Sequence, residues 1–224
     1  MNATNFANPV RVHKALTAAI EKRALVWMAL RTPQCITPDH LTSLALCSQI
    51  LAGVAYAFAH QNPAALWLVN LFLVLNWLGD SLDGTLARVR NRQRPCYGFY
   101  VDHVADALGA LALMAGLGCS RYLHWQIAVG LLVCFYLLSI ESYLATVALG
   151  DFHVSHGLFG PTEIRLLLMV GNFVVMAHPI ARIGNYSLLV FDLGGGIAIL
   201  AMVMMALRVI SRHVTILYRE EASR

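Results

Sequence analysis

Four aspartates stand close together in one of the most apolar parts of the sequence, at Asp80, Asp83, Asp102 and Asp106. In a helix, a spacing of three residues places two side chains about 60° apart and a spacing of four about 40° apart, so each pair shares one face. Four carboxylates that face one another repel unless a cation lies between them. Their oxygen ligands favour Mg²⁺, Mn²⁺ or Ca²⁺ over zinc, and the two pairs have room for two divalent ions.

Small residues lie beside the aspartates on the same helical faces. Gly84 and Ala87 continue the face of Asp80, and Gly98 precedes Asp102 by four residues. A bulky polar group can therefore approach the backbone there. In the alternative interpretation, the aspartates are solvated or pair with nearby arginines, namely Arg88, Arg90, Arg92 and Arg94. We favour a functional site, because ionised aspartates in an apolar helix are costly and these four have small neighbours at matching offsets.

The composition predicts a membrane protein of the all-α class. Of the 224 residues, 58% are hydrophobic and 12% are charged, against about 25% charged residues in soluble domains. The mean hydropathy is +0.64. Apolar runs of roughly 20 residues, long enough to cross about 30 Å of hydrocarbon, recur along the whole chain. They leave no room for a soluble domain, so we expect a single membrane-embedded domain over residues 1–224.

We expect six transmembrane helices in a bundle over about 40–210, preceded by an interfacial helix. The spans cover about 40–60, 64–88, 97–118, 122–149, 162–179 and 186–210. In the segment at about 10–32, apolar residues alternate with basic ones at helical spacing. This pattern is typical of an amphipathic helix that lies in the membrane interface.

Basic residues indicate how the chain is oriented. Of the 16 lysines and arginines, all but Arg121 and Arg182 fall on one side if both termini are cytoplasmic. The positive-inside rule therefore predicts that the N-terminus and the C-terminus are cytoplasmic. All four aspartates then lie at one depth, on the cytoplasmic side of what we expect to be a bacterial inner membrane.

The aspartates and their small neighbours form a longer pattern. It runs Asp80-x2-Asp83-Gly84-x2-Ala87-Arg88 and then Gly98-x3-Asp102-x3-Asp106. This pattern closely resembles the signature of the CDP-alcohol phosphotransferase (CDP-alcohol phosphatidyltransferase) family. The spacer between Arg88 and Gly98 has nine residues where the family usually has eight, which lengthens the basic loop. The interfacial helix, the six spans and a T-P-x-x-L-T opening at Thr37 are also similar to the family, although Asp39 stands where many members have Asn.

The resemblance implies an enzyme that transfers a substituted phosphate group from a CDP-linked donor to an alcohol hydroxyl and releases CMP. It implies two divalent ions, Mg²⁺ or Mn²⁺, held by the four aspartates, and Asp106 is our candidate for the base that takes the hydroxyl proton. The nucleotide-linked donor is expected to lie among Asp80, Asp83, Gly84, Ala87, Arg88 and Gly98. The expected form is a homodimer among membrane lipids, with no nucleic-acid partner.

A site at the membrane surface favours CDP-diacylglycerol as donor, because a lipid enters from the leaflet while a small alcohol arrives from the cytoplasm. The reaction then belongs to phospholipid biosynthesis, with an acceptor alcohol that the sequence does not identify. One alternative is a soluble CDP-alcohol donor with a lipid acceptor, as in choline and ethanolamine phosphotransferases. Another, in a different class, is a divalent-cation transporter. The apolar outer halves of the second and third spans argue against transport.

Two charged residues open the fifth span and are candidates for the acceptor site. Arg165 lies one turn inside the span, where it is suited to receive an acceptor phosphate, and Glu163 lies beside it. An ion pair of Arg165 with Glu163 or Glu141 is the alternative.

We predict structural roles for the remaining polar and small residues. Glu141 and Asp192 should face the bundle interior, where they line the polar cavity or pair. We expect His153 and His156 to be solvated in a cytoplasmic linker. Glycines inside the last span should allow close helix packing, and methionines there should form a lipid-facing or packing surface: Gly194, Gly195, Gly196, Met202, Met204 and Met205.

Overall fold

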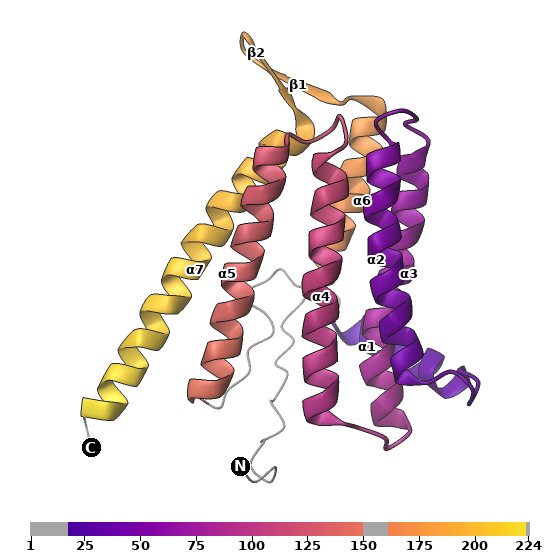
Figure 1. Cartoon of the computed structure of the whole chain (residues 1–224), viewed down its shortest axis with the longest axis vertical. Coiled ribbons are helices and arrows are strands. Elements are labelled where there is room, and N and C mark those ends of the chain that lie inside the picture. Colours follow the sequence, from indigo (N-terminus) through magenta and orange to yellow (C-terminus); the bar gives the residue numbers. More distant parts are fainter. Residues whose placement is uncertain (1–17, 150–160, 223–224) are drawn as a thin grey trace.

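The structure, a computed structural model, describes residues 18–149 and 161–222 (Figure 1). Within these ranges it contains seven helices and one two-stranded hairpin. The helices are α1 (Ala18–Arg31), α2 (Pro38–Phe58), α3 (Ala65–Val89), α4 (Pro95–Gly118), α5 (Trp125–Leu149), α6 (Pro161–Ala177) and α7 (Val190–Ala222). The hairpin consists of β1 (Ile180–Ile183) and β2 (Tyr186–Leu189).

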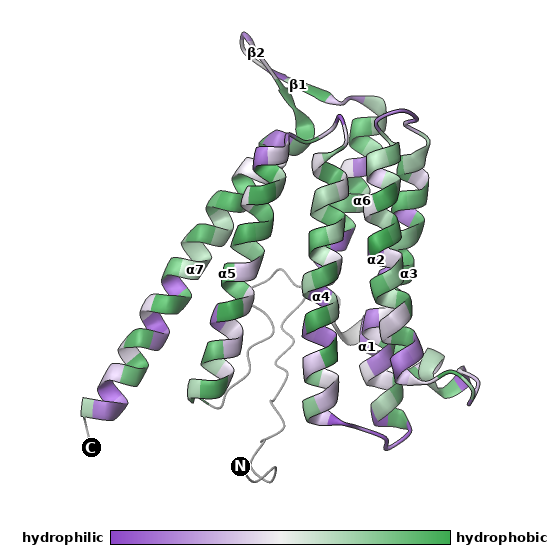
Figure 2. Ribbon diagram, in the orientation of Figure 1, coloured by the Kyte–Doolittle hydropathy of each residue, from purple (hydrophilic) through white to green (hydrophobic). Residues whose placement is uncertain are grey.

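Five of the described helices, α2, α3, α4, α5 and α7, are long and apolar enough to cross a membrane. Hydrophobic residues fill their middle sections, and hydrophilic residues concentrate toward the ends (Figure 2). The sixth expected span, α6, has 17 residues, which is about 26 Å of helix and at the lower limit for crossing the hydrocarbon core. The predicted all-α membrane fold is therefore confirmed, while the count of six spans stays a prediction.

The last predicted span, at about 186–210, begins four residues before α7, the helix that carries it. Its first residues form β2, which pairs antiparallel with β1 so that Ile183 lies opposite Tyr186. The two residues between them make a tight turn, in which Gly184 has a φ of 59°. Glycine adopts this left-handed conformation without steric cost, which favours a hairpin at this point. The helix that follows runs on to Ala222.

The bundle has a close-packed part and a more open part. In Figure 1, α2, α3, α4 and α6 lie side by side, whereas α5 and α7 run together and lean away from them toward one end. The main buried cluster joins the close-packed helices and includes Tyr56, Leu66, Leu73, Leu117 and Val175. The pocket described below lies within this close-packed part.

Two glycines let α2 and α4 approach until their backbones touch. A Cβ atom on Gly116 would lie 1.8 Å from the carbonyl oxygen of Gly53. A Cβ atom on Gly53 would lie 2.2 Å from the carbonyl oxygen of Ala112. Any side chain at these positions would therefore push the helices apart. The contact fixes α4, which carries Asp102 and Asp106, against α2.

The predicted packing role of the glycines in α7 holds for Gly195 alone. Its Cβ atom would lie 2.6 Å from the side chain of Ile127 on α5. Gly194 and Gly196 have no described atom within 4 Å of the corresponding position, so the close-packing prediction is wrong for them. Of the methionines that follow, Met204 is exposed, in keeping with a lipid-facing surface, while Met202 and Met205 are half-buried.

Helix α1 lies across one end of the bundle rather than along it (Figure 1). Its Leu25 and Ala29 are buried against Leu82 and Leu86 of α3. Other apolar residues of the same helix, including Trp27, are exposed. Apolar side chains on both sides suit a helix that lies between the bundle and surrounding lipid. The predicted segment at about 10–32 is described from residue 18 onward, and its earlier residues lie outside the described ranges.

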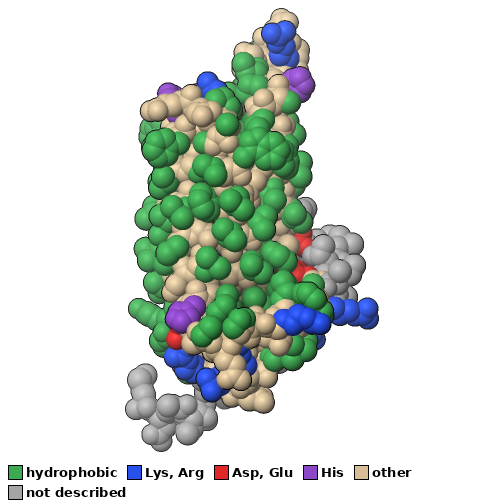
Figure 3. Space-filling model, turned by 90° about the vertical axis from the view of Figure 1, so that its right-hand side faces the viewer, with side chains coloured by type: hydrophobic (Ala, Val, Ile, Leu, Met, Phe, Trp, Pro, Cys, Tyr) green, Lys and Arg blue, Asp and Glu red, His purple; other side chains and the backbone are tan. Residues whose placement is uncertain are grey.

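The face drawn in Figure 3 is covered by hydrophobic side chains along the length of the bundle. More Lys and Arg side chains gather at one end than at the other, and this is the end where α1 lies. The positive-inside rule uses this kind of asymmetry, so the arrangement agrees with the expected orientation, which stays a prediction.

Candidate active site

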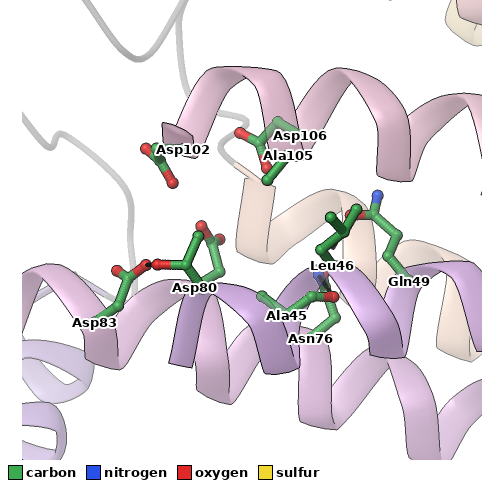
Figure 4. Close-up of a pocket in the computed structure, with 10 residues that line it drawn as sticks. Ala45, Leu46, Gln49, Asn76, Asp80, Asp83, Asp102, Ala105 and Asp106 are labelled. Carbon is green, nitrogen blue, oxygen red and sulfur yellow. Dashed lines mark hydrogen bonds between the residues drawn. The ribbon is translucent and has the colours of Figure 1, made fainter. Parts of the chain in front are cut away.

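The four aspartates of the sequence motif line one pocket. Asp80 and Asp83 come from α3, and Asp102 and Asp106 come from α4. Their side chains point into the space between the two helices (Figure 4). Spacings of three and four residues keep each pair on one helical face, and the packing of α3 and α4 against α2 brings the two faces together. The structure thus brings together the residues that the sequence selected.

Helix α2 supplies the third wall of the pocket, beside the aspartates. Thr42 donates a hydrogen bond from its hydroxyl to Asp83 Oδ2 at 2.6 Å. The other oxygen of Asp83 accepts the backbone N–H of Gly84. Hydrogen bonds to both oxygens stabilise the ionised form of the carboxyl group and hold its orientation. The remaining lining residues are Ala45, Leu46, Gln49, Asn76 and Ala105.

Two amide side chains of the pocket are absent from the sequence motif. Asn76 is buried on α3, one turn before Asp80, and Gln49 lies opposite it on α2. Asn76 Nδ2 donates to the carbonyl oxygen of Ala45 at 2.9 Å and to Gln49 Oε1 at 3.3 Å. The signal that marks both residues in the sequence is an uncharged polar group inside an otherwise apolar span, where it needs a partner.

Arg165 of α6 reaches the aspartate cluster. Its Nη2 donates to Asp80 Oδ2 at 2.7 Å, and its Nε donates to Asn76 Oδ1 at 2.7 Å. The alternative prediction was an ion pair of Arg165 with Glu163 or Glu141. It is corrected here, because the guanidinium pairs with Asp80. Sequence spacing cannot reveal this pair, because Asp80 and Arg165 lie 85 residues apart. Glu163 is half-buried in the first turn of α6.

One nitrogen of Arg165 differs from the two that hold Asn76 and Asp80. Nη1 is buried and makes no hydrogen bond with any residue that the structure describes. The side chain is 12% exposed, so the lost hydration is not replaced at this atom. A buried guanidinium with an unused donor, next to an acidic pocket, is suited to bind an additional oxygen-bearing group.

The donor set of the pocket fits a hard divalent cation, because it consists of carboxylate oxygens with amide and hydroxyl groups around them. In the present side-chain positions, no three His, Cys, Asp or Glu side chains of the described ranges are arranged to hold one ion. Asp80 is engaged by Arg165 and Asp83 by Thr42. The aspartates therefore have the right chemistry for a divalent ion, although their present positions do not converge on one.

The residues predicted to flank the donor lie at the end of the pocket near the α3–α4 loop. Gly84 and Ala87 are half-buried on α3, whereas Arg88 is exposed and donates a hydrogen bond to Thr85. Gly98 is exposed in the first turn of α4, and a Cβ atom there would meet no described atom within 4 Å. The backbone beside Gly98 is thus open to a ligand.

Two arginines of the α3–α4 loop are engaged away from the pocket. Arg90 donates to the carbonyl oxygens of Thr32, Pro33 and Ile36, which holds the linker between α1 and α2. Arg94 pairs with Asp39, and this hydrogen bond raises the pKa of Arg94 above its ordinary value. The alternative interpretation required nearby arginines to pair with the four aspartates. Arg90 and Arg94 do not do so.

Two further acidic residues inside the predicted spans, Glu141 and Asp192, are paired. Glu141 of α5 lies 2.5 Å from His213 of α7, and both side chains are largely buried. Asp192, in the first turn of α7, accepts the backbone N–H of His124 at 2.9 Å. Both acidic side chains are thus structural links between segments, which is one of the two roles predicted for them. His153 and His156 lie outside the described residues.

Comparison with known proteins identifies the family to which the chain belongs. A search of curated proteins finds no match to the chain. The family model for CDP-alcohol phosphatidyltransferase matches residues 35–213, which include every helix that lines the pocket. The match covers well over half of the sequence, so the chain belongs to the CDP-alcohol phosphatidyltransferase family.

Proposed function

We propose that the donor of this protein is CDP-diacylglycerol and that the acceptor is a small alcohol, so that the product is a phospholipid and CMP is released. This is a specific form of the reaction of the family, whose members transfer a phosphate group from a CDP-alcohol to an acceptor. The observation that carries the proposal is the convergence of four aspartates from two neighbouring helices on one pocket of a membrane protein.

In this proposal Asp80, Asp83, Asp102 and Asp106 hold divalent cations, which members of the family generally use, and the cations are Mg²⁺ or Mn²⁺. Bound cations supply charge stabilisation to the phosphate oxygens and to the CMP leaving group. Thr42 and the backbone N–H of Gly84 support the function of Asp83 by fixing its carboxylate. Such supporting hydrogen bonds orient ligands and tune their affinity.

Asp106 takes the proton of the acceptor hydroxyl in the proposed reaction. Its carboxyl group lines the pocket and accepts no hydrogen bond from any residue within the described ranges, so its oxygens are available to a substrate. The hydroxyl oxygen forms a bond to the phosphorus as the phosphorus–oxygen bond to CMP breaks, and the proton passes to Asp106. The hydroxyl becomes acidic only as its oxygen bonds to phosphorus, so the proton moves to Asp106 late in this step.

Arg165 binds the acceptor in the proposed reaction, through a phosphate or another anionic group. The unpartnered Nη1 is the donor that such a group would satisfy, while Nε and Nη2 hold the guanidinium in place. Glu163, two residues earlier, lies in the first turn of the same helix. The donor occupies the other side of the pocket, beside Gly84, Ala87, Arg88 and Gly98, with Asp80 and Asp83.

The protein as a whole is proposed to act as one domain of residues 1–224, a homodimer in a bacterial inner membrane with both termini cytoplasmic. This orientation places the pocket near the cytoplasmic surface, where a lipid donor and a soluble alcohol can meet. A soluble CDP-alcohol with a lipid acceptor would use the same pocket with the roles exchanged. The transporter alternative has less support, since three buried polar side chains in the outer half, Tyr56, Asn70 and Asn172, are uncharged and bond to one another.

The test is release of CMP by purified protein. CDP-diacylglycerol is supplied in mixed micelles with Mg²⁺ or Mn²⁺ and, in turn, glycerol phosphate, inositol phosphate, serine and other alcohols. We expect CMP release that depends on one acceptor and a lipid product that contains it. A parallel reaction contains CDP-choline or CDP-ethanolamine with diacylglycerol, and activity there alone would reverse donor and acceptor. Failure of the protein to bind any cytidine nucleotide would contradict the proposal.

A further inference from the structure

One acidic side chain of α1 binds two helices of the active site at once. Glu21 Oε1 accepts hydrogen bonds from Trp77 Nε1 at 2.9 Å and from the hydroxyl of Thr162 at 3.2 Å. A third, longer contact of 3.4 Å comes from the hydroxyl of Ser81. Trp77 and Ser81 belong to α3, and Thr162 belongs to α6. Glu21 is also the single acidic residue of α1.

The partners of Glu21 on α3 are the sequence neighbours of active-site residues. Trp77 follows Asn76, and Ser81 follows Asp80. Consecutive residues of a helix point about 100° apart, so Asn76 and Asp80 form one face of α3 and Trp77 and Ser81 form the next. The first face bonds to Arg165, and the second bonds to Glu21.

Helix α6 is thus held to α3 from two sides. Thr162 lies one helical turn before Arg165, in the first turn of α6. Arg165 attaches this end of α6 to Asn76 and Asp80, and Thr162 attaches it, through Glu21, to Trp77. A helix fixed at two points one turn apart can neither slide nor rotate without breaking a bond. The direction in which Arg165 presents its unpartnered Nη1 depends on both attachments.

We propose that Glu21 is a positioning residue for the acceptor site: it holds the first turn of α6 so that Arg165 presents a free nitrogen to the acceptor. This inference rests on the proposed function, because it gives Arg165 the acceptor as its ligand. It assigns to the interfacial helix α1 a part in catalysis, although the family signature lies entirely outside that helix.

The first test separates acceptor affinity from the other kinetic constants. In Glu21→Ala we expect the KM for the acceptor to rise about tenfold, the size of effect that follows loss of a hydrogen bond to a charged group. The KM for CDP-diacylglycerol should stay within about twofold, because the donor side of the pocket does not contact Glu21. Thr162→Val, which removes only the hydroxyl, should reproduce the rise, and Thr162→Ser should restore the wild-type value. Lys22→Ala, at an exposed neighbouring position, is the matched control and should change neither constant.

A double-mutant cycle shows whether Glu21 acts through Arg165. If it does, Glu21→Ala adds no further increase to the acceptor KM of an Arg165→Ala protein. If Glu21 supports the fold alone, the two effects multiply, which would overturn the inference. Glu21→Gln keeps one acceptor oxygen and should raise the KM by less than Glu21→Ala, so it remains informative where the alanine variant fails to fold.

A measurement that needs no substrate tests the inference independently of the proposed function. Hydrogen exchange of the backbone amides at 161–168 should become faster in Thr162→Val and in Glu21→Gln than in wild type or Lys22→Ala. Faster exchange in a protein that releases no CMP with any acceptor would reject the proposed function and support the link between Glu21 and α6. Unchanged exchange and an unchanged acceptor KM in an active protein would overturn the inference while the proposed function stands.

Discussion

The contact between α2 and α4 predicts a large effect from a single methyl group. In Gly116→Ala the new Cβ atom would lie 1.8 Å from the carbonyl oxygen of Gly53, and ordinary contacts begin at 3.4 Å. The helices must therefore separate by about 1.5 Å, because both sides of the contact are backbone and no side chain can turn away. Overpacking of a core usually costs 1–3 kcal/mol, and we expect about 3 kcal/mol here. For a chain of this size that lowers the Tm by roughly 6–12 °C.

The same separation should reduce activity. Asp106 lies ten residues before Gly116, about 15 Å along the same helix. A shift of about 1 Å in catalytic groups can lower a rate by about a hundredfold. We therefore expect kcat for CMP release to fall by at least about tenfold at temperatures where the variant is folded.

The assay is thermal unfolding of purified protein in detergent, followed by tryptophan fluorescence, with CMP release measured well below the Tm. Gly196→Ala is the matched control, because it adds the same methyl group where no described atom lies within 4 Å. Alanine is the better helix former, so the Tm of this control should equal or slightly exceed that of wild type. A Tm of Gly116→Ala within about 2 °C of the control would refute the backbone contact on which this reasoning depends.

Three further predictions concern the chemistry of the pocket. Asp106→Asn should fold with a wild-type Tm and release no CMP, and near-normal turnover would remove Asp106 as the base. Thr42→Val removes the 2.6 Å hydrogen bond to Asp83 and should weaken Mn²⁺ binding by about tenfold or more, measured by calorimetry. Thr42→Ser keeps the hydroxyl and should bind as wild type, whereas equal losses in both variants would contradict the role of this bond. EDTA should abolish CMP release, and Mg²⁺ or Mn²⁺ but not Zn²⁺ should restore it, as expected for a pocket of oxygen ligands.

Helical periodicity explains why the core of the candidate site could be predicted from the sequence. Asp80 and Asp83, like Asp102 and Asp106, share a face in any regular helix, so their grouping needs no knowledge of the remaining fold. Hydropathy likewise predicts the long apolar helices, because crossing a membrane imposes their length and composition. Local rules of this kind hold whatever the tertiary arrangement.

Contacts between distant segments could not be predicted in this way. The pair of Arg165 with Asp80 depends on which face α6 turns toward α3, which packing decides and sequence spacing does not reveal. The sequence does not predict the hairpin of β1 and β2, because Tyr186–Leu189 is apolar and continues into an apolar helix. Hydropathy alone therefore predicts that these residues belong to a span. Gly184 beside Asn185 was the available signal for a turn.

The attachment of α6 includes more polar bonds to its neighbours than close backbone contacts, in contrast to that of α2, α3 and α4. Those three helices meet through backbone contacts and a buried apolar cluster, and they carry all the residues that line the aspartate pocket. Helix α6 joins the same apolar cluster through Val175, and it is also joined to its neighbours by polar bonds along one face, through Thr162, Arg165 and Asn172. Hydrogen bonds between helices in a membrane average about 0.6 kcal/mol each, so these five bonds supply roughly 3 kcal/mol.

This difference separates the two halves of the proposed reaction. The carboxylates assigned to cations and donor lie on helices that cannot move apart without losing close packing. The arginine assigned to the acceptor lies near the start of α6, where the polar bonds of Thr162 and Arg165 attach the helix. Replacing polar residues on α6 or their partners should therefore alter the use of the acceptor while the aspartate pocket persists. On this view, choice of acceptor depends on the polar face of α6, and the chemistry common to the family depends on the packing of α2, α3 and α4.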